Sequence, residues 1–275
     1  MNRQQHSRFV EFMAFVGLLM SSFVVASCDD ATVTPPSITT TDPNQEAIPT
    51  ESAPDEFQRL IKDGQVKLVY DSEPEFVKAD TGKADFVLIF NQTYQYNFIK
   101  VKRNGRWHVT LTAKQVKPTV RLEHTIRLPS PYKSDHVWED RLLRHEFDHV
   151  TVSLDPRPAM LIEHLFQHLP PIEHSFDAGQ EPSEELYKKL FNEEFDKRGQ
   201  AVIELIKRNN VLLDNVSKHG TEPVPRRAEF FGRLFLKENL AESKFPFLEE
   251  VLDLLETPKY RKAELRFLPR DPTEE

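Results

Sequence analysis

The sequence contains a single cysteine, Cys28, among 275 residues. An intrachain disulfide and a cysteine-based zinc site are therefore both excluded. Glycine is also scarce, with eight residues, and the chain has neither a Gly-rich phosphate loop nor a G-x-S-x-G nucleophile elbow. Nucleotide-loop chemistry and a serine or cysteine nucleophile are thus poor explanations of the function.

An excess of basic residues is also absent. The chain has 36 Lys and Arg against 44 Asp and Glu, which gives a net charge of −8 at pH 7. A moderately acidic chain without a long Lys/Arg run is not expected to bind nucleic acid. The same balance argues against electrostatic docking onto anionic lipid.

The apolar run from residue 12 to residue 27 is too short for a committed membrane span. It ends in Val25-Ala26-Ser27-Cys28, which resembles a bacterial lipobox. We therefore predict that residues 1–27 are a lipoprotein signal peptide and that Cys28 is acylated, so that the protein is anchored in the lipid bilayer. The alternative is an ordinary secretory signal with an incidental cysteine.

This anchor predicts a location in the bacterial cell envelope, facing the periplasm or the exterior. Asp29 follows the cysteine, which is compatible with retention in the inner membrane. Residues 28–55 are rich in Thr, Pro, Ser and Asp and cannot bury a core, so we predict a disordered tether. Residues 56–275 are then long enough for one domain.

Within this domain the patterns predict strands first and helices afterwards, which is typical of the α+β class. Asn104-Gly105 between two alternating segments predicts a tight hairpin. Strands are expected at 66–70, 86–90, 94–102, 106–113 and 116–128, and helices at 136–153, 157–169, 183–210, 224–240 and 246–256. The helices from about residue 223 are expected to form a C-terminal extension.

Residues 145–149 have the pattern H-E-x-x-H. Their flanks predict a helix, on which His145 and His149 share one face and can both bind a zinc ion. Glu146 beside them could act as a general base toward water and then as a general acid toward a leaving amine. The alternative is an amphipathic helix whose two histidines are ordinary surface or core residues.

Two histidines leave tetrahedral zinc in need of a third protein ligand. Asp155 has metzincin-like spacing, but Val152 occupies the position where those sites turn at glycine, and an Asp-Pro pair also predicts a helix cap. Glu163 and Glu193 are possible by distance along the chain. His219 precedes Gly220 at the end of the long helix, where a histidine commonly interacts with the helix dipole.

Three features together resemble a bacterial family known as predicted secreted zinc-dependent proteases. Strands end in Leu128-Pro129, a helix carries L-x-x-H-E-x-x-H from Leu142, and residues 214–220 match D-x-x-T-x-H-G with Ser217 in place of threonine. The resemblance implies that His219 is the third ligand, with Asp214 or Ser217 holding its ring. It covers residues 85–220, and the family's own activity is inferred from its motif.

The expected protein is therefore an α+β, zincin-like domain with an antiparallel sheet followed by the H-E-x-x-H helix and further helices. We expect a membrane-anchored zinc metallopeptidase that hydrolyses peptide or protein substrates in the envelope. The substrate would lie along a sheet edge near strand 116–128, with His124, His108 or Tyr132 as oxyanion donor. The alternative is a non-catalytic lipoprotein with a structural zinc site or a partner-binding helical surface.

Overall fold

The computed structural model describes residues 24–26, 43–79 and 81–263 of the chain. Cys28 and most of the predicted signal peptide lie outside the described residues, so the structure does not bear on acylation. Within the described part, every helix is either too short or too polar to cross a membrane.

Two unusually long strands form the centre of the sheet. Strand β4 (Lys83–Arg103) and strand β5 (Arg106–Pro129) pair along their whole length as one antiparallel hairpin. Asn104 and Gly105 both have positive φ, 49° and 77°, as a tight two-residue hairpin turn requires. The predicted turn is thus confirmed, but the separately predicted strands merge because a register shift at Thr93/Gln95 lets pairing continue.

The other strands are short, and the sheet order is β1-β4-β5-β3-β2, with β6 added beside β5. Their bounds are Val24–Ala26 for β1, Gln45–Ala47 for β2, Val66–Asp71 for β3 and Ile172–Ser175 for β6. Strand β3 runs parallel to β5, so the sheet is mixed and the expectation of a wholly antiparallel sheet is wrong. The prediction of only helices after residue 131 missed β6.

The three longest helices each start at a side-chain cap. Asp140, Asp155 and Ser183 accept backbone hydrogen bonds at the starts of α3, α4 and α5. The predicted helix from residue 136 therefore begins only after Asp140. The helices are α1 (Asp55–Lys62), α2 (Pro74–Ala79), α3 (Arg141–Leu154), α4 (Pro156–Gln167), α5 (Glu184–Ser217), α6 (Arg227–Arg233), α7 (Lys237–Glu242), α8 (Leu248–Leu255) and α9 (Pro258–Arg261).

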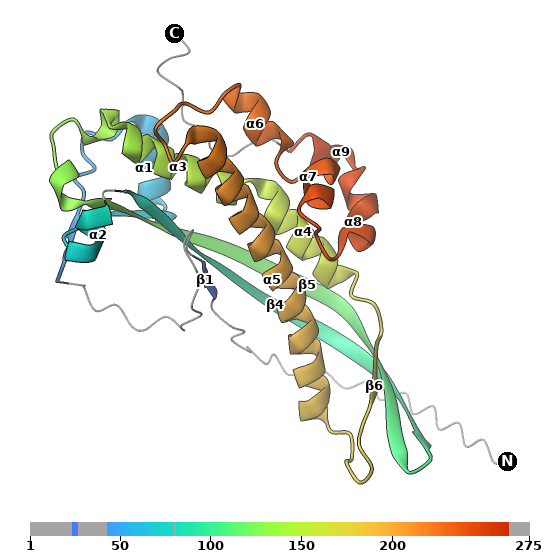
Figure 1. Cartoon of the computed structure of the whole chain (residues 1–275). Helices are drawn as coiled ribbons and strands as arrows, with labels where there is room; N and C mark the ends of the chain where they lie inside the picture. Colours follow the sequence, from blue (N-terminus) through green and yellow to red (C-terminus); the bar gives the residue numbers. More distant parts are fainter. Residues whose placement is uncertain (1–23, 27–42, 80, 264–275) are drawn as a thin grey trace.

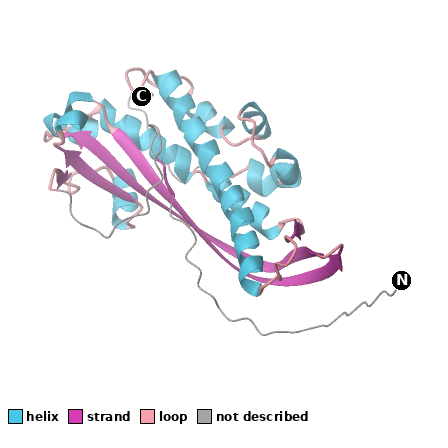
Figure 2. Cartoon of the chain, turned by 60° about the horizontal axis from the view of Figure 1, so that its bottom comes forward, coloured by secondary structure: helices cyan, strands magenta, loops and turns pink. Residues whose placement is uncertain are grey.

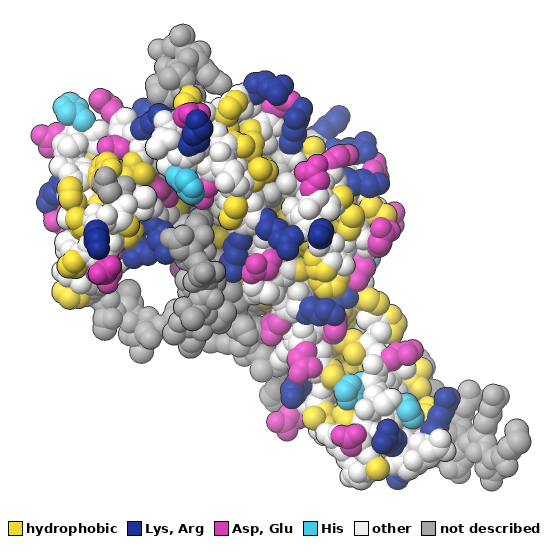
Figure 3. Space-filling model, viewed as in Figure 1, with side chains coloured by type: hydrophobic (Ala, Val, Ile, Leu, Met, Phe, Trp, Pro, Cys, Tyr) yellow, Lys and Arg dark blue, Asp and Glu magenta, His cyan; other side chains and the backbone are white. Residues whose placement is uncertain are grey.

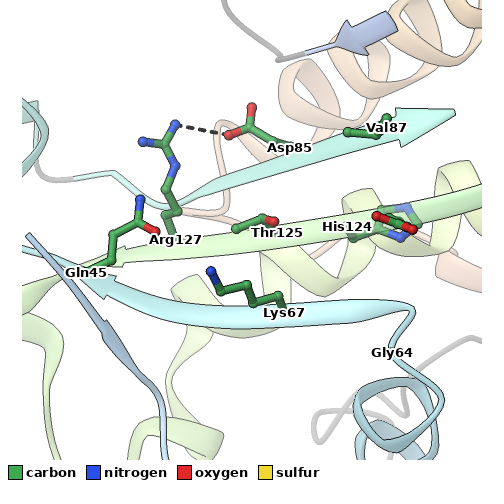
Figure 4. A pocket seen from close by; sticks show the side chains of 9 residues that line it. Gln45, Gly64, Lys67, Asp85, Val87, His124, Thr125 and Arg127 are labelled. Carbon is green, nitrogen blue, oxygen red and sulfur yellow. Dashed lines mark hydrogen bonds and ion pairs between the residues drawn. The ribbon is translucent and has the colours of Figure 1, made fainter. Parts of the chain in front are cut away.

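The larger helices cover one face of the sheet (Figures 1 and 2). On that inner face, alternate residues of β4 such as Phe86, Leu88 and Phe90 are buried. The opposite, outer face carries a shallow polar depression in which Arg127 pairs with Asp85 (Figure 4).

Two hydrophobic cores hold the domain together, and their buried residues lie between Ile48 and Tyr260. The main core joins the β4–β5 hairpin to α4, α5 and the C-terminal helices, so the segment after residue 223 is an integral part of the fold. Ile48 and Ala53 are buried in the second core, and β2 pairs with β3. The predicted tether therefore ends well before residue 55, and a chain beginning at Asp29 contains both complete cores.

Candidate metal centre

Helix α3 places both histidines of the motif in the interior. His145 and His149 are 6% and 5% exposed, and their ring centroids lie 4.7 Å apart. The side of α3 that carries Phe147 and Val150 packs in the second core, which fixes the rotation of the helix. The two imidazoles therefore face α5 across the helix pair, one turn apart.

Helix α5 contributes the third group, Asp214. Its Oδ1 lies 3.1 Å from Nε2 of His145 and 3.1 Å from Nε2 of His149. The two Nε2 atoms are 3.2 Å apart. His145, His149 and Asp214 thus form a buried cluster that can hold a metal ion.

The dimensions of this triangle suit a small divalent cation. Tetrahedral bonds of 2.0–2.1 Å from zinc to nitrogen and oxygen place neighbouring ligand atoms about 3.3 Å apart. The observed separations of 3.1 to 3.2 Å lie close to that value. A cation at the centre would also compensate for bringing a carboxylate and two imidazoles into a poorly solvated site.

The orientation of His149 leaves its Nε2 atom available to bind a metal ion. Its Nδ1 donates a hydrogen bond to Oδ1 of Asn210, at 3.1 Å, so that the lone pair of Nε2 points into the triangle. Asn210 lies one turn before Asp214 on the same helix. Nδ1 of His145 is buried and has no hydrogen-bond partner among the described residues.

The two ligand types influence each other's charge. Burial lowers the pKa of His145, which favours the neutral imidazole that a metal requires. Burial alone would raise the pKa of Asp214, but the close contacts of its carboxylate with the imidazoles of His145 and His149 outweigh this and hold its pKa below the usual range. Asp214 is therefore a carboxylate at neutral pH.

Glu146 lies beside the cluster and under the start of β4. It is 3% exposed, and burial raises its pKa to about 7, although the neighbouring His149 and a backbone hydrogen bond from Ala84 act in the opposite direction. A Cβ at Gly82 would lie 2.5 Å from Oε1 of Glu146, so the close approach of this segment depends on glycine. Glu146 is thus positioned between the cluster and β4, at a pKa suited to proton transfer.

Asp148, within the same motif, connects the site helix to the C-terminal helices. It forms a buried ion pair with Arg227 at the start of α6. Burial raises the pKa of Asp148, and the Arg227 guanidinium opposes that shift. The C-terminal helices therefore support α3 directly.

His219, the predicted third ligand, stands at the edge of this cluster. Its side chain is 76% exposed, and its Nδ1 lies 3.9 Å from Oδ1 of Asp214. Asp214, predicted to hold the ring of His219, instead places its own Oδ1 against both imidazoles and is the third group of the cluster that could hold a metal. Ser217 hydrogen-bonds to the carbonyl of Leu213 and the backbone N–H of Gly220, so it stabilises the helix end and makes no bond to His219.

The alternative third ligands lie elsewhere. Asp155 caps α4 and forms a buried ion pair with Arg157. Glu163 and Glu193 are exposed on their helices. The cluster thus selects α5 as the source of the third ligand, although at a residue five positions before the one that was predicted.

Two of the three suggested oxyanion donors, His124 and His108, bond to groups outside the cluster. Both ring nitrogens of His124 are bonded, Nδ1 to the carbonyl of Gln65 and Nε2 to Ser153 Oγ at 2.6 Å, so it is a satisfied core histidine. His108 lies on the distal part of the hairpin and bonds to Ser175. Tyr132 is half-buried against the second core.

The sequence interpretation did not identify Asn210, Gly82 or Arg227 as parts of the site. Asn210 and Asp214 are four residues apart, and because α5 continues to Ser217, beyond the predicted end at residue 210, both polar groups lie on one face of it. Gly82 and Arg227 act only through the tertiary fold, and no local pattern marks them.

Comparison with known proteins yields no match to this chain among family models, curated proteins or solved structures.

Proposed function

We propose that this protein is a zinc-dependent peptidase whose metal is held by His145, His149 and Asp214. The observation that carries the proposal is the buried triangle of three ligand atoms, together with the buried Glu146 on the same helix, whose pKa responds to the nearby His149 and Asp214. Three protein ligands leave one position of a tetrahedral zinc open, as catalytic sites do. A structural site would be closed by a fourth ligand, whereas the neighbouring His219 is exposed.

Zinc in such a site supplies Lewis-acid polarisation of the scissile carbonyl and a more acidic water nucleophile. Glu146 takes the proton of the attacking water and afterwards donates it to the leaving amine. Its burial against Ala84 and Gly82 keeps bulk water away from this proton. Asn210 fixes the tautomer and the ring plane of His149 throughout.

His219 is the donor that we assign to the developing oxyanion. It stands at the mouth of the cluster, with its ring exposed and 3.9 Å from Asp214. Lys218, His219 and Gly220 have successive positive φ values of 50°, 54° and 76°, a backbone that is costly for the two non-glycine residues. This turn holds His219 beside the proposed metal ligands, and His219 is not one of them.

The edge of β4 is the proposed binding site for an extended polypeptide. Residues 24–26 already pair there as an antiparallel strand, opposite Phe86–Leu88. Glu146 contacts the same strand at Ala84, two residues earlier. Since the sequence predicts that residues 24–26 belong to a leader that is removed, a substrate would take the vacated edge by strand addition. This edge differs from the expected one, because strand 116–128 is part of β5, whereas residues 24–26 pair with β4.

The test compares the chain beginning at Asp29 with its Glu146→Gln variant. Elemental analysis is expected to find one zinc per chain in both proteins, because Glu146 is not a ligand. Cleavage of unfolded casein should occur with the parent chain and fall by about 10²–10⁴-fold in the variant. Zinc without cleavage in the parent would leave a metal-binding protein, and absence of zinc in both would remove the metal centre itself.

A further inference from the structure

The β4–β5 hairpin concentrates positive charge in a chain that is acidic overall. Between Phe86 and Leu122 the sequence has seven Lys and Arg and no Asp or Glu, whereas the whole chain has a net charge of −8. The net charge of the whole chain therefore does not describe the hairpin, which is strongly basic. This distribution reverses the expectation, drawn from net charge, that anionic lipid is an unfavourable partner.

The end of this arm, residues 98–107, is here called the hairpin tip. It projects beyond the helices at the lower right of Figure 1. Of the exposed large hydrophobic side chains in the described part, three belong to the tip: Phe98, Ile99 and Val101, at 49%, 68% and 42% exposure. Hydrophobic and basic side chains are both visible on this projecting end in Figure 3.

The basic residues of the tip have no acidic partners. Lys100, Lys102, Arg103 and Arg106 are all exposed, and none of them forms an ion pair within the described residues. Lys100 and Lys102 instead lie over the ring of Trp107, at 5.2 and 5.3 Å. By alternation along β4, Lys100 and Lys102 share a face with Phe98, whereas Arg103 shares the opposite face with Ile99 and Val101, so the tip exposes cations and apolar side chains on both faces.

Helix α5 partly covers one face of the hairpin and leaves the opposite face open. The ring centroids of Phe98 and Tyr187 of α5 are 5.1 Å apart, and those of Tyr96 and Phe191 are 5.4 Å apart. Ile99 and Val101 alternate with these residues and so point to the opposite, outer face. The acidic residues at the start of α5 belong to the covered side.

We propose that the hairpin tip docks onto an anionic phospholipid surface. Lys and Arg side chains near such a surface attract its headgroups, while exposed aliphatic and aromatic residues enter the interfacial region. The tip combines both groups and lacks a neutralising carboxylate among residues 98–107. Together with the predicted acyl chain on Cys28, it would supply a second membrane contact, independent of any hydrolytic activity.

The experiment uses the chain beginning at Asp29, which lacks the acylation site and retains both cores. Vesicles of phosphatidylcholine alone are compared with vesicles that contain about 30% phosphatidylglycerol, in low and high salt. We expect sedimentation with the anionic vesicles only, weakened by salt. Equal binding to both vesicle types, or binding to neither, would overturn the proposal.

A matched pair of variants locates the contact. The double change Lys102→Glu/Arg103→Glu should weaken vesicle binding at least about tenfold. The double change Lys259→Glu/Lys262→Glu alters the net charge equally at exposed positions outside the hairpin, and it should have little effect. Equal loss in both variants, or no loss in the first, would contradict docking by the tip. Tighter binding to duplex DNA than to vesicles would replace the lipid by nucleic acid.

Trp107 gives a readout that does not depend on charge. The chain has two tryptophans, and Trp138 is 5% exposed in the second core. Brominated anionic lipid should therefore quench Trp107, and Trp107→Phe should abolish the quenching while Trp138 emission persists. Quenching that survives in the Trp107→Phe variant would place the membrane contact elsewhere.

Discussion

Gly220 lies directly against the imidazole of His145: a Cβ at Gly220 would stand 2.7 Å from Cγ of that ring. The turn after α5 therefore closes over a candidate metal ligand at a distance that glycine alone permits. Its φ of +76° adds a second reason for glycine at this position.

Gly220→Ala is expected to weaken zinc binding at the proposed site, because the new methyl group must displace the His145 ring. Gly64→Ala is the matched control, since Gly64 has φ +69° with open space around its Cβ position. Both variants should lose about 1 kcal/mol of stability from backbone strain. Competition with a chromophoric chelator should show weaker zinc binding in Gly220→Ala alone; unchanged affinity there would mean that the ring tolerates the displacement.

Asp214→Ala and His219→Ala distinguish the ligand from its neighbour. Asp214→Ala should lower zinc affinity by more than about 100-fold, because two protein ligands remain. His219→Ala should retain one zinc per chain and lose about 10²-fold in hydrolysis rate if it stabilises the oxyanion. Zinc stoichiometry, measured by elemental analysis, decides whether Asp214 or His219 is the third ligand. Loss of zinc from the His219 variant alone would restore His219 as that ligand.

Arg227→Met should destabilise the fold by about 3 kcal/mol, because it leaves the carboxylate of Asp148 buried without its partner. The double variant with Asp148→Leu should recover much of that loss. Arg226→Ala removes an exposed ion pair beside it and should cost less than about 1 kcal/mol. Urea unfolding measures all three free energies, and equal costs for the two arginines would show that the buried pair stabilises nothing.

His124 predicts a loss of stability in mild acid. Burial lowers its pKa from 6.5 to about 4, and the hydrogen bond that its ring donates to the Gln65 carbonyl only partly opposes this shift. The unfolded chain therefore binds a proton between pH 6.5 and 4 that the folded protein excludes. The contribution of neutral His124 to the free energy of unfolding is complete above pH 6.5. It decreases by on the order of 3 kcal/mol as the pH falls toward 4.

The measurement is the free energy of unfolding at several pH values, compared with His124→Asn. The variant should be less stable at pH 7 but show a shallower decline between pH 6.5 and 4. Identical slopes in the two proteins would assign the acid sensitivity to other groups.

The sequence pattern predicted those parts of the fold whose turn, helix and cap signals lie within a few residues of one another. The Asn104-Gly105 turn, the α3 motif and the cap at Asp155 depend on neighbours in the sequence. The parallel pairing of β3 with β5 and the burial of Ile48 depend on distant segments, and neither was predicted.

The candidate site divides in the same way. His145, Glu146 and His149 follow from one helical motif. The choice of Asp214 over His219 depends on the rotation of α5 and on where that helix ends, since Asp214 is in its last turn and His219 follows it in a left-handed turn. Sequence spacing places both residues near the site but does not determine which of them enters it.

Helix α5 also sets the distance between the hairpin tip and the metal cluster. Tyr187 contacts the hairpin tip and Asp214 enters the metal cluster, and the 27 residues from 187 to 214 span roughly 40 Å of continuous helix. A surface bound at the tip would therefore be separated from the metal centre by a fixed spacer. Peptide bonds close to that surface would be out of reach, and the protein would select its targets by their height above the membrane as well as by their sequence.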